Sequence, residues 1–147
     1  MIKKEFLFDT CFKTKNDLFK GATEFLMKNN YVSAEFEESL NKREQDFPTG
    51  LPTVPPVAIP HTDGSYVKKD TILCIVNRNE VPFNEMGGDE DDFVFPRVFF
   101  MLVLGNGETH LAQLKNLVEK IQDGQLVAKS LEAKNLEEFA IVVNTYL

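Results

Sequence analysis

The residue best suited to covalent chemistry in this sequence is His61, one of only two histidines. It follows the apolar residues 57–59 and Pro60, in the run Val-Ala-Ile-Pro-His. Proline has no N–H to give to a sheet, so Pro60 ends a strand and fixes where the next side chain projects. An imidazole with a pKa of about 6.5 can act as nucleophile, base or proton carrier near neutral pH. Taken alone, His61 can also be read as a loop histidine that merely hydrogen-bonds a carbonyl.

The second histidine, His110, follows another predicted strand and stands in the first turn of a predicted helix. The reactive crevice of an open α/β sheet lies beyond the carboxyl ends of its strands, so we expect both imidazoles to meet there. The N–H groups and the dipole at a helix start disfavour an imidazolium and favour an anion. A neutral His110 would then donate one N–H to a phosphoryl oxygen near His61. The alternative is a plain polar residue at a helix start.

Further polar residues stand upstream of the Pro-His pair. Arg43 follows Phe36 by seven positions, which predicts that its side chain faces inward from the end of a helix. A guanidinium there suits fork-like recognition of phosphate oxygens, and a surface ion pair is the alternative. Glu44 stands beside it, and Thr49-Gly50 adds a hydroxyl and a backbone that can approach a ligand closely. The sequence contains no nucleophile elbow, glycine-rich phosphate loop or paired catalytic carboxylates, so the nucleophile it offers is His61.

Strands that alternate with helices must position these residues. Strands are predicted at residues 5–8, 57–59, 71–76 and 98–104. Helices are predicted between Thr14 and Asn29, after a Ser33 cap, from about Thr109 to Gly124, and at residues 126–131 and 136–146. Residues 46–56 are expected to form a loop without regular structure, and residues 84–92 an exposed acidic loop. This order predicts a single α/β domain over residues 1–147, with a mixed, mostly parallel sheet flanked by helices on both sides.

Composition excludes several classes of function. With 147 residues, a formal charge of -7 and no dense Lys/Arg cluster, the chain is a poor fit for nucleic acid or an anionic membrane surface. No segment approaches the roughly 20 apolar residues that span a bilayer, and the N-terminus lacks a signal-peptide pattern. Cys11 and Cys74 are far apart in sequence and form no close-spaced ligand set. We therefore expect a soluble, cytoplasmic protein with reduced thiols, no metal and no cofactor.

The polar residues together resemble a known family. The IIA components of the bacterial phosphoenolpyruvate:sugar phosphotransferase system (PTS), in the fructose–mannitol class (type 2), have an Arg-Glu pair, a Thr-Gly loop and an apolar strand that ends in Pro-His. Here these elements are Arg43-Glu44, Thr49-Gly50 and Ala58–His61. A second histidine often opens a leucine-striped helix in that class, here His110–Leu114.

Within the class, three segments look most like galactitol-type components. They are Phe47–Gly50, the acidic loop before the long strand, and Lys120–Asp123. Galactitol-type proteins need not keep a histidine where His110 stands, so the resemblance carries more weight for His61 than for His110.

The resemblance implies a phosphotransferase that works through a phosphohistidine. His61 would accept a phosphoryl group from the phosphocarrier protein HPr and pass it to a cysteine of a IIB component. Sugar or sugar alcohol would then be phosphorylated as it enters through the membrane IIC component. Arg43, His110 and Thr49 would stabilise the phosphoryl group, with Glu44 in a supporting role and without a metal.

Two other functions stay open at this point. A regulatory relative, similar to the nitrogen-related IIA proteins, would use the phosphorylation state of His61 to control its partners. A histidine-dependent hydrolase would need a carboxylate or a metal to activate water, and only Glu44 or Asp63 is available. The identity of the sugar cannot be read from the chain, because a IIA component does not touch the sugar in the family scheme.

Overall fold

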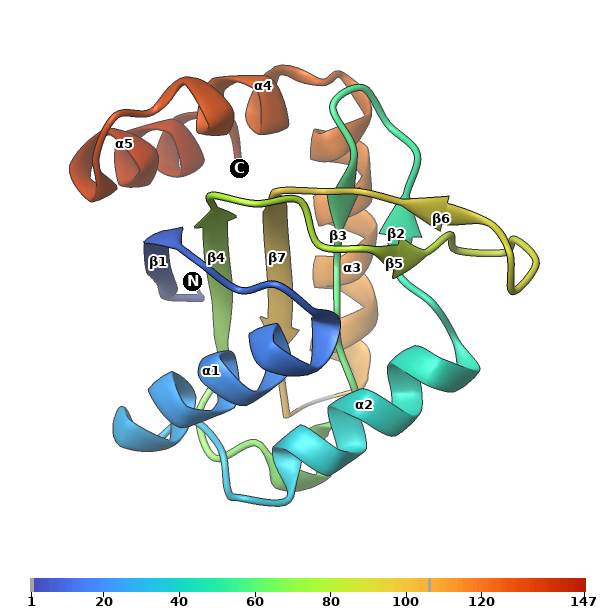
Figure 1. The fold of residues 1–147 in the computed structure, drawn as a ribbon. Helices are drawn as coiled ribbons and strands as arrows, with labels where there is room; N and C mark the ends of the chain where they lie inside the picture. Colours follow the sequence, from blue (N-terminus) through green and yellow to red (C-terminus); the bar gives the residue numbers. More distant parts are fainter. Residues whose placement is uncertain (1, 106) are drawn as a thin grey trace.

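Five strands form the central sheet of the computed structural model, which describes residues 2–105 and 107–147 (Figure 1). In spatial order the strands are β1 (Lys4–Thr10), β4 (Thr71–Asn77), β7 (Val98–Val103), β3 (Val57–Ala58) and β2 (Gly50–Leu51). β1 pairs with β4 and β3 with β7 in parallel, whereas β4 with β7 and β2 with β3 are antiparallel. The carboxyl ends of β3 and β7 therefore lie at the same edge of the sheet.

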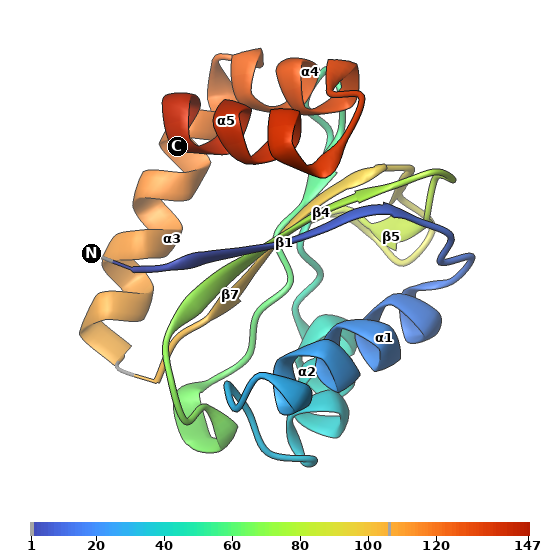
Figure 2. The same cartoon turned by 90° about the vertical axis from the view of Figure 1, so that its left-hand side faces the viewer.

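Helices cover both faces of this sheet (Figure 2). The helices are α1 (Lys15–Lys28), α2 (Phe36–Asp46), α3 (Gly107–Gln122), α4 (Gln125–Glu132) and α5 (Leu136–Tyr146). One 3-10 turn, η1 (Gly64–Tyr66), follows β3, and a small hairpin joins β5 (Phe83–Asn84) to β6 (Phe93–Val94). No helix in the described part of the chain is both long and apolar enough to span a membrane. The predicted α/β domain, with a mixed sheet between two helical layers, is confirmed.

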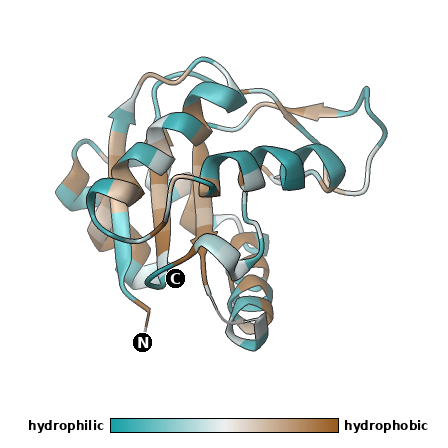
Figure 3. Cartoon of the chain, turned by 90° about the horizontal axis from the view of Figure 1, so that it is seen from below, coloured by the Kyte–Doolittle hydropathy of each residue, from teal (hydrophilic) through white to brown (hydrophobic). Residues whose placement is uncertain are grey.

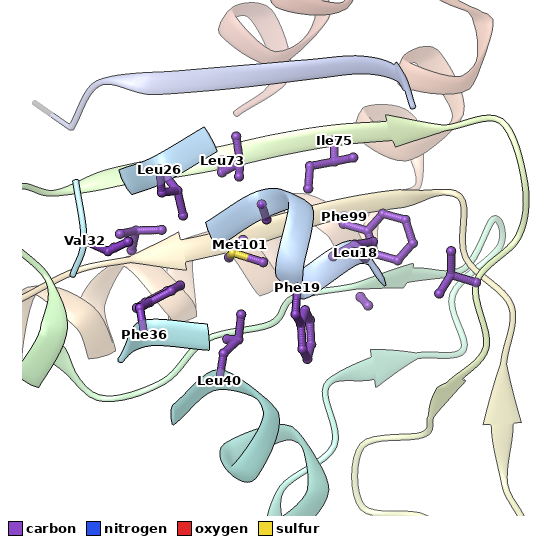
Figure 4. Packing of buried hydrophobic residues seen from close by; sticks show 14 of the residues in the cluster. Leu18, Phe19, Leu26, Val32, Phe36, Leu40, Leu73, Ile75, Phe99 and Met101 are labelled. Atoms are coloured by element: carbon purple, nitrogen blue, oxygen red, sulfur yellow. The ribbon is translucent and has the colours of Figure 1, made fainter. Parts of the chain in front are cut away.

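The side chains of β4 and β7 point alternately to the two faces of the sheet, and this divides the core into two halves. Every residue of these strands is buried, and successive side chains point to opposite faces. One set packs under α1 and α2 (Figure 4), and it includes Leu73, Ile75, Phe99 and Met101. The other set packs under α3, α4 and α5, and it includes Ile72, Cys74, Phe100 and Leu102. Coloured by hydropathy, the central strands are mostly brown and much of the helical surface is teal (Figure 3).

Local signals in the sequence account for most helix ends. The Thr14 hydroxyl accepts a hydrogen bond from the Asp17 amide and caps α1, and Asn30 takes a left-handed φ of 62° just beyond its end. The Asn135 side chain caps α5 in the same way. α2 differs from expectation, because Glu35 occupies the cap position without a side-chain hydrogen bond. Ser33 contributes only its carbonyl, which accepts from the Phe36 amide.

The loop prediction for residues 46–56 is wrong at two places, the first of which is Asp46, the last residue of α2. Gly50 and Leu51 form β2, which pairs with Ala58 and Val57 of β3. The prolines around this strand confine it to two residues at the edge of the sheet. Beyond it, Gly50 forms an isolated parallel bridge with Glu85, and its carbonyl accepts from the Met86 amide at 2.7 Å. A Cβ at Gly50 would lie 2.5 Å from Val94 Cγ2, so glycine here lets the β5–β6 hairpin pack against the sheet edge.

The packing of α5 on β1 gives a test of the core. The Phe139 ring is fully buried, and its centroid lies 5.5 Å from that of Phe6 and 6.0 Å from that of Phe8. We predict that Phe139→Ala lowers the free energy of unfolding by about 3–5 kcal/mol, measured by denaturant titration. Ile141, on the same helix, is 62% exposed, so Ile141→Ala should stay within about 0.5 kcal/mol of the unchanged protein. Equal effects of the two substitutions would contradict this account of the core.

Candidate functional site

His61 is held beside β7 by backbone hydrogen bonds that continue past the end of β3. The Ile59 amide donates to the Thr49 carbonyl (3.2 Å), and the Pro60 carbonyl accepts from the Leu102 amide (3.1 Å). His61 itself forms an isolated parallel bridge with Leu102. Pro60 lacks an N–H, but its carbonyl still pairs, so the chain leaves the sheet with the histidine in a defined place. The side chain is buried, with 7% of its surface exposed.

The hydrogen bond of the His61 ring fixes its tautomer. Nδ1 lies 2.8 Å from the Ile59 carbonyl oxygen, which can only accept, so Nδ1 carries the hydrogen. In the neutral ring the lone pair is then on Nε2. Burial is the main cause that lowers the pKa of His61, with smaller contributions from the nearby His110 and Arg43, and the bond to Ile59 opposes them. His61 is therefore neutral at pH 7, with an unprotonated Nε2.

His110 lies next to His61, as predicted from the two strand ends. The ring centroids are 5.1 Å apart in an edge-to-face arrangement. His110 stands in the first turn of α3, and its ring is hydrogen-bonded to the backbone of Leu104. Burial first, and Arg43 second, lower the pKa of His110, whereas the Leu104 bond and Asp63 raise it. Two neutral imidazoles thus share one edge of the sheet.

A pocket of about 420 Å³ opens in front of the two rings. Its lining includes both histidines, Arg43, Thr62 and Asp63, and the apolar side chains Leu111 and Leu114 of α3. Leu111 is 70% exposed at the rim. The pocket therefore combines an unprotonated ring nitrogen, a guanidinium and an apolar rim.

Arg43 reaches this pocket from a different side of α2 than expected. The buried face of α2 is Phe36, Leu40 and Glu44, spaced by four residues, and Arg43 is exposed. The inward orientation predicted from Phe36 is thus wrong, because the helix turns its buried face toward Leu40 and Glu44. The Arg43 guanidinium stacks 4.5 Å from the centroid of the Phe47 ring. None of the ion pairs found within residues 2–105 and 107–147 uses it, so its donors can face an anion in the pocket.

Glu44 and Thr49 contact each other rather than the pocket. The Thr49 amide and hydroxyl donate to the two carboxylate oxygens of Glu44, at 2.7 and 2.8 Å. Both residues are buried, and desolvation raises the pKa of Glu44 although the bonds from Thr49 oppose it. This places Thr49 away from the position expected for a phosphate-binding hydroxyl. Its contact instead ties the end of α2 to the start of β2.

Sequence reasoning missed part of the site. Thr62 is buried next to His61, and its hydroxyl contacts Ser39 of α2 at 2.6 Å. The Asp63 carboxylate accepts from the Ser65 amide (2.8 Å). Hydrogen bonding to the Ser65 side chain first, and to this amide second, lowers the pKa of Asp63. The Asp-Gly-Ser run signals such a turn in the sequence, whereas nothing in it pairs Ser39 with Thr62. Among the described residues, no cluster of three or more His, Cys, Asp or Glu side chains is arranged to hold a metal ion.

Comparisons with known proteins agree with this geometry. The family described as "Phosphoenolpyruvate-dependent sugar phosphotransferase system, EIIA 2" matches residues 1–145. No curated protein sequence matches the chain. Among solved structures, IIA mannitol from Escherichia coli is 22% identical with a TM-score of 0.75, and 95% of each chain is covered.

Two further structures share the fold. A complex of Escherichia coli enzyme IIAMTL with phosphorylated enzyme IIBMTL matches with a TM-score of 0.77 and 22% identity, over 96% of this chain and 94% of that chain. Nitrogen Regulatory Protein IIA-Ntr from Neisseria meningitidis is 29% identical with a TM-score of 0.72, over 94% of this chain and 92% of that one. The fold of this chain is thus shared with IIA proteins named for mannitol and with one named for nitrogen regulation.

The buried ring of His61 should titrate below the ordinary histidine value. We predict that NMR titration finds the His61 pKa under about 6.5, with the Nδ1–H tautomer at neutral pH. Since the folded-state pKa is below the unfolded one, His61 contributes most to stability at high pH and less as pH falls through about 6.5. The stability of the unchanged protein should therefore fall more between pH 7 and 5 than that of His61→Gln. A pKa above 6.5, or an Nε2–H tautomer, would be incompatible with this site.

Proposed function

The chain belongs to the EIIA 2 family of the phosphoenolpyruvate-dependent sugar phosphotransferase system, and from this we propose that His61 is the residue that carries the phosphoryl group. The family acts in phosphoryl transfer. The observation that best supports this role for His61 is its Nδ1–H···O=C bond to Ile59, which leaves the Nε2 lone pair free next to the pocket.

Transfer to His61 needs no base to activate the nucleophile. The Nε2 lone pair attacks the phosphorus of an incoming phosphohistidine, a P–Nε2 bond forms, and the donor's N–P bond breaks and returns its electron pair to the donor ring. The His61 ring gains positive charge as the bond forms, and the Ile59 carbonyl stabilises the Nδ1–H. Positioning and charge neutralisation carry most of the catalysis in such a step.

Arg43 and the start of α3 supply the neutralising groups. The Arg43 guanidinium lines the pocket and can donate two parallel hydrogen bonds to phosphoryl oxygens. The N-terminus of α3 adds the favourable end of its dipole. A neutral imidazole has one N–H, which in His110 is committed to Leu104. His110 therefore donates to a phosphoryl oxygen only as an imidazolium, a form that a nearby phosphoryl dianion favours.

The proposed donor is HPr, and the proposed acceptor is a cysteine of a IIB component that serves a membrane IIC permease. This rests on the family and on the structural likeness to an enzyme IIAMTL found in complex with phosphorylated enzyme IIBMTL. The chain's own cysteines do not fit the acceptor role. Cys74 is buried in the core, where desolvation raises its pKa, and Cys11 follows β1, which ends at the opposite edge of the sheet from His61. A cytoplasmic location belongs to the same proposal.

A regulatory function is the second candidate, because the nitrogen regulatory IIA protein is 29% identical to this chain. In that case His61 would still be phosphorylated, but no IIB cysteine would receive the group. Transfer from the phosphorylated chain to IIB proteins encoded beside it would separate the two functions. The galactitol-type assignment stays a prediction that the same transfer assay can test.

His61→Ala tests the proposed function directly. The protein is incubated with phosphoenolpyruvate, enzyme I and HPr, and acid-labile phosphate is mapped by mass spectrometry. We expect one phosphoryl group on His61 of the unchanged chain and none on a folded His61→Ala variant, because the substitution removes the proposed nucleophile. Phosphate mapped to another residue, or phosphorylation that persists in the alanine variant, would reject the assignment.

His110→Ala should have a smaller effect than His61→Ala. The substitution removes one ring but leaves the backbone N–H groups of α3 and the Arg43 guanidinium in place. We expect slower phosphorylation that is still detectable and still on His61, measured as the initial rate of phosphate incorporation. The opposite pattern, in which His110→Ala abolishes phosphorylation and His61→Ala does not, would make His110 the acceptor.

A further inference from the structure

Two hydroxyl groups join α2 to the loop that carries His61. Ser39 Oγ and Thr62 Oγ1 are 2.6 Å apart, and Thr62 Oγ1 also lies 3.4 Å from the Ser39 carbonyl oxygen. Thr62 is 4% exposed. The carbonyl can only accept, so the Thr62 hydroxyl donates to it and the Ser39 hydroxyl donates to Thr62. The two side chains thus satisfy each other between a helix and a loop.

This contact links the segments that carry His61 and Arg43, the two residues that act together in the proposed reaction. Thr62 directly follows His61, and Ser39 precedes Arg43 by four residues, one turn of α2. In an α-helix the carbonyl of residue 39 faces the amide of residue 43. The Thr62 hydroxyl therefore touches the helical turn from which Arg43 reaches the pocket.

We propose that Ser39 and Thr62 are a positioning pair that fixes the His61 ring relative to the Arg43 guanidinium. The inference rests on the proposed function of His61 and extends it to two residues outside the family motif described above. Thr62 lines the pocket, but its hydroxyl is committed to Ser39, so it acts through the loop rather than on the phosphoryl group.

The geometry of phosphoryl transfer makes such a contact matter. The guanidinium stabilises the transferring group only if it stays within hydrogen-bond distance while Nε2 attacks, and small displacements are costly. Arg43 is exposed and is otherwise held by its stacking on Phe47, so the position of its helix depends on contacts made further back. The Ser39–Thr62 hydroxyl pair is one such contact, and it joins α2 directly to the residue that follows His61.

The test compares Thr62→Val, Ser39→Ala and the double variant by single-turnover transfer from phosphorylated HPr. Losing one hydrogen bond that holds the attack geometry should slow transfer about three- to tenfold in each single variant. The double variant should be no slower than the slower single one, because both substitutions remove the same contact. Thr62→Ser keeps the hydroxyl and should restore most of the rate. The half-saturating concentration of phosphorylated HPr should change little.

Thr10→Val is the matched control. The Thr10 hydroxyl donates to Asn77 Oδ1 at 2.8 Å, so this is also a hydrogen bond between side chains of two elements. It lies where β1 and β4 end, at the opposite edge of the sheet from His61. This variant should lose stability without losing transfer rate in the folded protein. Unchanged transfer in folded Thr62→Val and Ser39→Ala would overturn the proposal. So would slowing by Thr62→Val alone, which would mean that the Thr62 hydroxyl binds the phosphoryl group directly.

A second measurement does not depend on phosphoryl transfer. Burial is the main cause that lowers the pKa of His61, and the nearby Arg43 lowers it further. If Thr62→Val or Ser39→Ala loosens the loop from α2, NMR titration of the unphosphorylated protein should find a higher His61 pKa in both variants and no change in Thr10→Val. An unaltered His61 pKa in both would count against the positioning pair. Absence of phosphate on His61 in the unchanged protein would instead reject the proposed function, while the titration still decides whether the pair positions the ring.

Discussion

The site depends on the parallel pairing of β3 with β7. Val57 and Ala58 lie opposite Val98 and Phe99, so the two strands end at one edge of the sheet although more than 40 residues separate them in the chain. His61 follows one of these ends, and His110 follows the other at the start of α3. An antiparallel pairing would send the two histidines to opposite edges. The 5.1 Å between the ring centroids is therefore a consequence of strand direction.

Burial and backbone carbonyls then give these two rings their chemistry. Each imidazole is hydrogen-bonded to a backbone carbonyl, His61 to Ile59 and His110 to Leu104, and desolvation is the main cause that lowers both pKa values. The backbone thus does for His61 what a carboxylate does in many other sites, since it fixes the tautomer. Because a carbonyl bears no full charge, it leaves the ring neutral and Nε2 nucleophilic at neutral pH.

Residues whose neighbours in sequence are also their neighbours in space could be predicted well. The apolar run at 98–104 contains β7, which is buried on both faces, and the helix predicted at residues 136–146 is α5. Predictions of side-chain contacts with residues distant in the sequence were less accurate. Arg43 was expected to face inward, but the core contacts Glu44 instead. Thr49 was expected near the phosphoryl group, but its hydroxyl contacts Glu44, and Gly50 approaches the β5–β6 hairpin.

The sequence by itself determined the longer strands and helices and the two strand ends that carry histidines, because hydrophobic periodicity, proline and helix caps act within a few residues of the chain. Its motifs also carried the resemblance to the family. Only the tertiary structure decided which ring nitrogen is free, from which side Arg43 reaches the pocket, and that Thr62 contacts Ser39. Each of these depends on a hydrogen bond, on the removal of water or on the rotation of a packed helix. These contacts form only when segments distant in the sequence pack together, so no short stretch of sequence predicts them.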